Sequence, residues 1–177
     1  MALAKRRKLA CPLIASKKES TEMTTRAPAN VPTVSMTALQ TTLSDCLALV
    51  ADTKHAHWNV KGSDFFQLHE LFDRLVDDLT DLSDTVAERL VALGGLARGT
   101  IDETASHRTL ATLNAELQSQ SDLLAGLIER YSDLSAKLVP LINETADAGD
   151  PTTSDVLTEA SRSVDKARWF LMSHQAT

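Results

Sequence analysis

The sequence predicts an all-α fold, and three observations support this expectation. Residues 64–93 contain no proline or glycine, and their apolar side chains recur at steps of three and four, as on one face of a helix. Segments before and after this stretch repeat leucines at the same spacing. Aromatic residues make up only 4% of the 177 residues, and glycine and proline are few. We therefore expect one helical domain, large enough to fold around its own core.

Residues 1–32 are expected to form a disordered basic tail. The first 30 residues contain seven bases and two acids, hence 7 − 2 = +5, whereas the remaining 147 contain 11 bases and 22 acids, hence 11 − 22 = −11. Prolines and the lack of helical periodicity predict disorder. The basic residues are Lys5, Arg6, Arg7, Lys8, Lys17, Lys18 and Arg26.

Three interpretations of this tail remain open. A basic arm would neutralise DNA phosphates without reading the base sequence. A secretory signal fits less well, because the apolar stretch at residues 9–15 is short and is followed by lysines instead of a small-residue cleavage site. A dispensable extension is the third interpretation. No segment is expected to span a membrane, since no apolar run approaches the roughly 18 residues required.

Two helices are expected before a long connection. The first spans residues 33–61 and places Cys46 among its apolar positions, where the thiol is expected to act as a small buried hydrophobe. The second spans residues 64–93, and the glycines that follow end it. Cys11 is the only other cysteine, so neither a disulfide framework nor a CxxC pair is expected, which fits a reducing cytoplasm.

Two more helices are expected after a connection of about fifteen residues, which is unusually long. A bundle in which two successive helices run in the same direction needs such a crossover along its length. The third helix is expected over residues 110–148, kinked or split at Pro140. Thr153 or Ser154 is expected to cap the last helix, which ends near His174.

A second face of the helix expected at 64–93 contains possible metal ligands. His69, Asp73, Asp84 and Glu88 fall within about 100° of one another, away from the apolar stripe. Asp73 and Asp84 lie roughly 16 Å apart along the axis, so one helix cannot surround a single ion with all four side chains. Two copies crossing antiparallel about a two-fold axis near Asp78 would place the first two ligands opposite the last two.

The alternative is that this face is simply acidic and solvated. Residues 64–88 contain eight acids and one base, which makes this alternative less convincing, because only a cation would relieve the repulsion between the acids. His57 joins the set if the turn at Gly62 folds the preceding helix back over His69. A packed core histidine is the other interpretation of His57, since it stands beside a tryptophan.

The stretch from Lys54 to Gly95 resembles the signature of the Dps family, the DNA-protection-during-starvation proteins, which are miniature ferritins. The likeness extends over about residues 34–174, with a second similar stretch at 155–170. The residues that match are Lys54, His57, Trp58, Asn59, Gly62, Phe65, His69, Asp73, Asp84, Ala87, Glu88, Arg89, Leu93, Gly94 and Gly95.

This resemblance implies a ferritin-like four-helix bundle, with a short helix in the crossover, that assembles into a hollow homo-dodecamer. It implies ferroxidase sites at two-fold interfaces, with Fe(II)/Fe(III) as the metal. The catalytic and metal ligands it implies are His57, His69 and Asp73 of one subunit and Asp84 and Glu88 of its mate, with Lys54 and Trp58 nearby. It also makes Glu144, Asp147, Asp150 and Asp155 candidates for an acidic iron-entry pore.

The function implied is oxidation of Fe(II) by hydrogen peroxide or O2, storage of ferric iron, and protection of double-stranded DNA bound without sequence preference. The expected location is the cytoplasm, at the nucleoid. A classical ferritin would contain Glu-x-x-His motifs, and this chain has none. A structural DNA-compacting protein with a structural metal site, and a zinc site that only joins a dimer, remain the alternatives.

Overall fold

The structure is a computed structural model that describes residues 31–117 and 119–175. Its helices are α1 (Val31–Asn59), α2 (Phe65–Ala92), α3 (Ile101–His107), α4 (Gln120–Asp147) and α5 (Pro151–Gln175). Across these described residues every regular element is a helix, which confirms the all-α expectation. The basic residues assigned to the tail lie outside the described residues.

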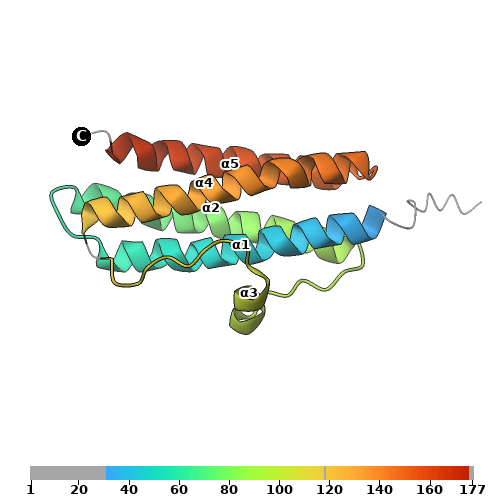
Figure 1. The fold of residues 1–177 in the computed structure, drawn as a ribbon, viewed down its shortest axis with the longest axis horizontal. Coiled ribbons are helices and arrows are strands. Elements are labelled where there is room, and N and C mark those ends of the chain that lie inside the picture. Colours follow the sequence, from blue (N-terminus) through green and yellow to red (C-terminus); the bar gives the residue numbers. More distant parts are fainter. Residues whose placement is uncertain (1–30, 118, 176–177) are drawn as a thin grey trace, which may run out of the picture.

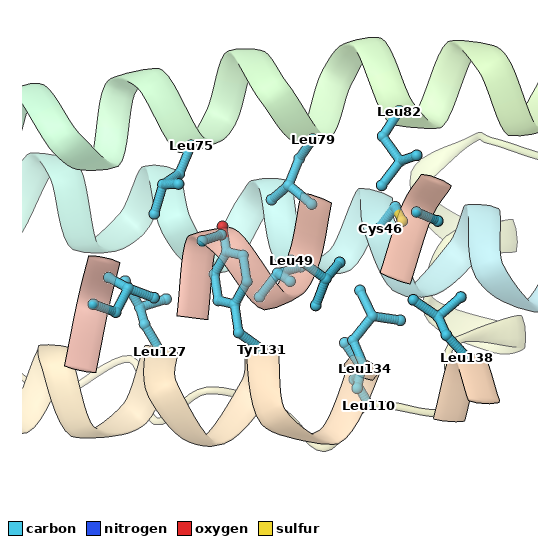
Figure 2. Packing of buried hydrophobic residues seen from close by; sticks show 14 of the residues in the cluster. Cys46, Leu49, Leu75, Leu79, Leu82, Leu110, Leu127, Tyr131, Leu134 and Leu138 are labelled. Carbon is cyan, nitrogen blue, oxygen red and sulfur yellow. The ribbon is translucent and has the colours of Figure 1, made fainter. Parts of the chain in front are cut away.

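The four long helices lie side by side, and α3 stands apart within the crossover (Figure 1). The helix α1 packs mainly on α2, and α4 packs mainly on α5. One cluster of buried side chains runs along the bundle. Figure 2 shows leucines of α2 facing Tyr131 and leucines of α4, with Cys46 of α1 in the same cluster. Burial raises the pKa of Cys46 to about 12, so this thiol behaves as the expected small hydrophobe.

The helix α1 is more apolar than the sequence analysis expected. By length and composition alone the helix over Pro32–Asn59 could cross a membrane, since an 18-residue window within it has a mean hydropathy of 1.3. However, 56% of that window is buried against the rest of the bundle. A helix covered by α2, α4 and α3 together has little solvated surface, and this position accounts for its composition.

The third long helix begins later than expected, at Gln120 instead of residue 110. Leu110 and Leu113 are buried as their spacing suggests, but they lie in an irregular segment of the crossover. The segment can approach α4 closely because Gly126 has no side chain. An added Cβ at this position would lie 2.7 Å from Leu113 Cδ1. The hydroxyl of Ser119 accepts the N–H of Asp122 and caps the helix there.

A buried carboxylate fastens this crossover to α1. Asp45 is 1% exposed, and its oxygens accept the main-chain N–H of Thr109 and that of Leu110, the latter at 3.0 Å, and the Thr109 hydroxyl at 2.6 Å. Lys137 of α4 donates to the Thr109 carbonyl at 2.6 Å. The crossover is therefore held at Thr109 by helices on both sides.

The chain turns sharply between α4 and α5. Of the two outcomes expected at Pro140, a split does not occur, because α4 continues through it. The last helix begins at Pro151, which suits the first helical position because it lacks an N–H. Asp150, not Thr153 or Ser154, provides the cap, since its Oδ1 accepts the N–H of Thr153 at 3.1 Å.

Candidate metal centre

Two histidines from neighbouring helices stack where α1 ends and α2 begins. The ring centroids of His57 and His69 are 3.7 Å apart, with 23° between the ring planes. The Nδ1 of each ring lies 3.0 Å from the main-chain carbonyl oxygen of the other residue. A carbonyl only accepts, so each Nδ1 must hold the proton. Each Nε2 therefore keeps its lone pair and is the nitrogen available to a metal ion.

A carboxylate and an ammonium group lie beside this pair. Asp73 Oδ1 is 3.8 Å from His57 Nδ1 and 2.5 Å from the Nζ of Lys54. The hydrogen bond from Lys54 lowers the pKa of Asp73 below its ordinary value of 3.8, and the positive charge of Lys54 acts in the same direction. Asp73 is therefore ionised and reachable, with a cation of the protein as its present partner.

Two aromatic residues border the histidines. The ring centroid of Phe65 is 5.1 Å from that of His69, at a tilt of 34°. Trp58 follows His57 in the chain, and 70% of it is exposed in the single subunit. His57 itself is 9% exposed, so it is packed as one of its two interpretations expects, and its Nδ1 lies 3.8 Å from Asp73 Oδ1.

The structure does not bring Asp84 and Glu88 to the histidines. Both are exposed on α2, further towards its C-terminal end. Within residues 31–117 and 119–175, no three or more His, Cys, Asp or Glu side chains gather around a point where they could hold a metal ion. The chain by itself thus presents the expected ligand set in two separate parts: His57 of α1 with His69 and Asp73 of α2, and Asp84 with Glu88 further along α2.

The four candidate pore residues separate into two groups. Glu144, Asp147 and Asp155 are exposed around the α4–α5 turn, as an acidic lining would require. Asp150 is only 6% exposed, and its carboxylate is used inside the protein. This residue should be removed from the set of pore candidates, because it does not present its charge to solvent.

Asp150 is the centre of what we call the Arg89–Asp150 junction, formed by Ser35, Arg89, Asp150 and Thr153. Arg89 Nη2 lies 2.8 Å from Asp150 Oδ1, while the hydroxyls of Ser35 and Thr153 donate to Oδ2 at 2.7 and 2.6 Å. Arg89 Nε also donates to the Thr153 hydroxyl at 3.0 Å. Burial alone would raise the pKa of Asp150, but these hydrogen bonds and the charge of Arg89 outweigh it and lower that pKa.

Sequence reasoning missed this junction, including its local contact between Asp150 and Thr153. An aspartate before a proline is a usable signal for a helix start. Its other partners are 61 and 115 residues away along the chain, and no local pattern connects them.

Comparison with known proteins gives a consistent result. Residues 36–177 match the Ferritin family, described as a ferritin-like domain. The chain is 39% identical over 147 residues to the DNA protection during starvation protein of Agrobacterium fabrum, which covers 83% of this chain and 91% of that protein. Dps from Microbacterium arborescens, in its high iron form, has a TM-score of 0.78 and 34% identity, covering 85% of this chain and 98% of the other.

DpsC from Streptomyces coelicolor is another similar structure, with a TM-score of 0.82 and 28% identity, covering 86% of this chain and 90% of the other. The family match covers well over half of the chain, and the Agrobacterium relative is aligned along nearly all of its length. The chain therefore belongs to the Dps family of ferritin-like proteins.

Proposed function

We propose that this protein is a ferroxidase that oxidises Fe(II) and stores the ferric product inside a shell of twelve identical subunits. The observation that carries the proposal is the His57–His69 pair, whose Nδ1 atoms are held by carbonyl groups so that each Nε2 is left for a metal ion, with ionised Asp73 3.8 Å from His57 Nδ1. Imidazole together with carboxylate is a donor set that suits iron in both oxidation states.

The site is completed by a second subunit. Asp84 and Glu88 lie on the same helix as His69 but too far along it to reach the same ion. A two-fold arrangement of two α2 helices places them opposite His57, His69 and Asp73 of the mate. The exposed indole of Trp58 and the unneutralised acidic face of α2 are both features that such an interface would cover.

The chemistry proposed is a two-electron reduction of peroxide by two ferrous ions. Each Fe(II) gives up one electron, the O–O bond breaks, and two protons are taken up to release two water molecules. Because both electrons arrive together, no hydroxyl radical is set free. The carboxylates contributed by the two subunits stabilise the higher charge of the ferric product.

The first test is anaerobic loading with Fe(II) followed by stoichiometric peroxide, with ferric absorbance and particle mass recorded together. Wild type is expected to oxidise iron rapidly and keep it in a particle of about twelve subunits. His57→Ala/Asp73→Ala is expected to oxidise iron only at the rate of the buffer. Equal rates in both proteins would contradict the site assignment. Metal-dependent assembly without peroxide consumption would instead support the alternative of a structural metal site.

A second test asks whether the site is shared. His57→Ala/Asp73→Ala and Asp84→Ala/Glu88→Ala each remove one half of the site, and each protein alone is expected to be inactive. In a randomly mixed assembly half of the two-fold pairs are hybrids, and each hybrid has one intact site, so roughly one quarter of the activity returns. No recovery in an assembled hybrid would contradict a site shared between subunits.

We further propose that the basic tail binds double-stranded DNA without sequence preference and places the particle at the nucleoid in the cytoplasm. The charge of +5 in residues 1–30, against −11 for the rest, supports this, as does the name of the Agrobacterium relative. Many weak phosphate contacts on one particle act together. Deleting residues 1–30 is expected to abolish a gel shift that wild type shows at low salt, while ferroxidase activity is unchanged.

A further inference from the structure

The turn between α1 and α2 is held by a residue from a distant part of the chain. Gln120, the first residue of α4, donates from Nε2 to Asp64 Oδ2 at 2.7 Å. In return, the main-chain N–H of Asp64 donates to Gln120 Oε1 at 3.2 Å. Both amide atoms of the glutamine are thus paired with one residue of the turn. Both residues are half-buried, which limits competition from water.

The turn itself is shaped to admit this glutamine. Gly62 has a φ of +139°, which side chains other than glycine rarely adopt. A Cβ at this position would lie 2.7 Å from Gln120 Oε1, so a side chain here would displace the amide. The absence of a side chain at Gly62 therefore serves the approach of α4 as well as the backbone angle.

The carboxylate of Asp64 is directed to this contact and away from its usual role. Asp64 stands at the N-cap of α2, yet its side chain makes no capping hydrogen bond. Its Oδ2 receives Gln120 and, at 3.2 Å, the hydroxyl of Ser63. An N-cap aspartate normally accepts an N–H of the first helical turn. Ordinary helix capping therefore does not explain this residue.

The position of this turn decides how the two histidines meet. His57 lies in the last turn of α1 and His69 in the first turns of α2, so the segment between them sets the register of the two helix ends. Each ring is hydrogen-bonded to the main chain of the other residue. A shift of one helix end would therefore move a ring and the acceptor of the other ring together.

We propose that Gln120 is a positioning residue for the metal centre: it fixes the turn through Asp64 and so keeps both Nε2 atoms where one metal site needs them. This inference rests on the proposed function of that site. Gln120 touches neither the metal ligands nor the metal, and it acts through the backbone of residues 62–64.

The chain offers a matched control at the other end of the bundle. Gln40 of α1 makes the same paired contact with Arg98: its Nε2 donates to the Arg98 carbonyl at 2.9 Å, and its Oε1 accepts the Arg98 N–H at 3.0 Å. Gln40→Ala removes both of these hydrogen bonds to the main chain of Arg98, and the one that Nε2 donates to the Ser44 hydroxyl at 3.1 Å, without touching the turn. It shows how much of an effect comes from general loss of stability.

The experiment measures Co(II) binding to the assembled protein by visible absorbance, since Co(II) reports coordination geometry and does not require peroxide. Gln120→Ala is expected to weaken binding about ten-fold and to change the absorption spectrum, as substitution of residues that orient ligands does. Gln40→Ala is expected to lower the thermal midpoint as much as Gln120→Ala does. Its affinity for Co(II) and its spectrum are expected to stay as in wild type.

A charge exchange tests the contact itself. Gln120→Glu places a carboxylate against Asp64 and is expected to weaken Co(II) binding as much as Gln120→Ala does. Adding Asp64→Asn supplies an amide donor to the new carboxylate and is expected to restore binding. Equal affinities for Gln120→Ala, Gln40→Ala and wild type would overturn the inference but leave the site intact. If wild type fails to bind Co(II), the proposed function fails as well, so the two failures are distinct.

Discussion

The two ends of α2 take part in polar clusters that differ in one respect. At the C-terminal end, the Arg89–Asp150 junction is closed: both oxygens of Asp150 accept hydrogen bonds, and Arg89 balances the charge inside the same subunit. At the N-terminal end, His57 and His69 use one nitrogen each to hold their rings and leave the other nitrogen free. A cluster whose polar atoms are all paired stabilises the bundle, whereas a rigid cluster with free nitrogen lone pairs can bind a metal ion.

The difference gives a rule for substitutions. A change in the closed junction is expected to reduce stability and leave metal binding as it is. A change among the open ligands is expected to remove metal binding and leave stability as it is. This division would fail if one substitution reduced both the stability and the metal binding of the protein.

The largest loss of stability is expected for Asp150→Ala. The substitution leaves Arg89 without its anion and the hydroxyls of Ser35 and Thr153 without their acceptor, so we expect about 3 kcal/mol less free energy of unfolding. Urea denaturation at fixed protein concentration measures it. Asp147→Ala, an exposed acid of the same turn, is the control and is expected to change little. Loss of Co(II) binding in folded Asp150→Ala would break the comparison.

The same pair of proteins tests the charge of Asp150 through pH. The folded-state pKa of this carboxyl lies below its ordinary value of 3.8. Its contribution to stability is therefore complete above about pH 4 and is lost as the pH falls through the lowered folded-state pKa. The stability difference between wild type and Asp150→Ala is expected to shrink as the pH falls below about 4. A difference that stays constant over this range would show that the charge does not contribute.

A smaller loss is expected for Asp45→Ala, at a second closed cluster. Two main-chain N–H groups of the crossover, at Thr109 and Leu110, lose their acceptor, which costs about 2 kcal/mol. Asp45→Asn keeps one acceptor oxygen and is expected to lose about half as much. Hydrogen exchange of the amides at 109 and 110 locates the effect. Unchanged protection of these two amides in Asp45→Ala would contradict the anchor.

The smallest change in stability is expected for Asp84→Ala/Glu88→Ala. Both side chains are exposed on a face with many acids, so removing them relieves repulsion and raises the free energy of unfolding by a few tenths of a kcal/mol, about 0.5 at most. The same protein is expected to lose Co(II) binding completely. Denaturation and metal titration of one sample give both values. A clear loss of stability would show that these carboxylates are structural.

The sequence was sufficient for the features that depend on local periodicity. The stripe of α2 from Leu68 to Leu90 is buried as its spacing predicts, and the two-face pattern of this helix located its exposed acids. The start of α4 was placed wrongly because Leu110 and Leu113 continue the leucine spacing while they belong to the crossover. Apolar spacing reports burial, and a loop that packs against a helix is buried as well.

The contacts of Asp150 and Gln120 could not be predicted for another reason. Asp150 meets Ser35, and Gln120 meets Asp64 across 56 residues of chain, so these pairs depend on how the helices are arranged in space. Four of the candidate ligands were proposed from their spacing on one helix, and His57 from the turn at Gly62 and the family resemblance. The residues that orient those ligands lie on other helices and follow from the tertiary structure alone.

The anchor at Asp45 also has a consequence for chain entropy. The segment between α2 and α4 would be a single long loop if it were free, but its attachment at Thr109 divides it into two shorter closures. The entropic cost of closing a loop rises slowly with length, by about 0.6 kcal/mol for each doubling. Extra residues inserted on either side of Thr109 therefore lengthen only one closure, and the crossover can vary in length while α3 and α4 keep their places.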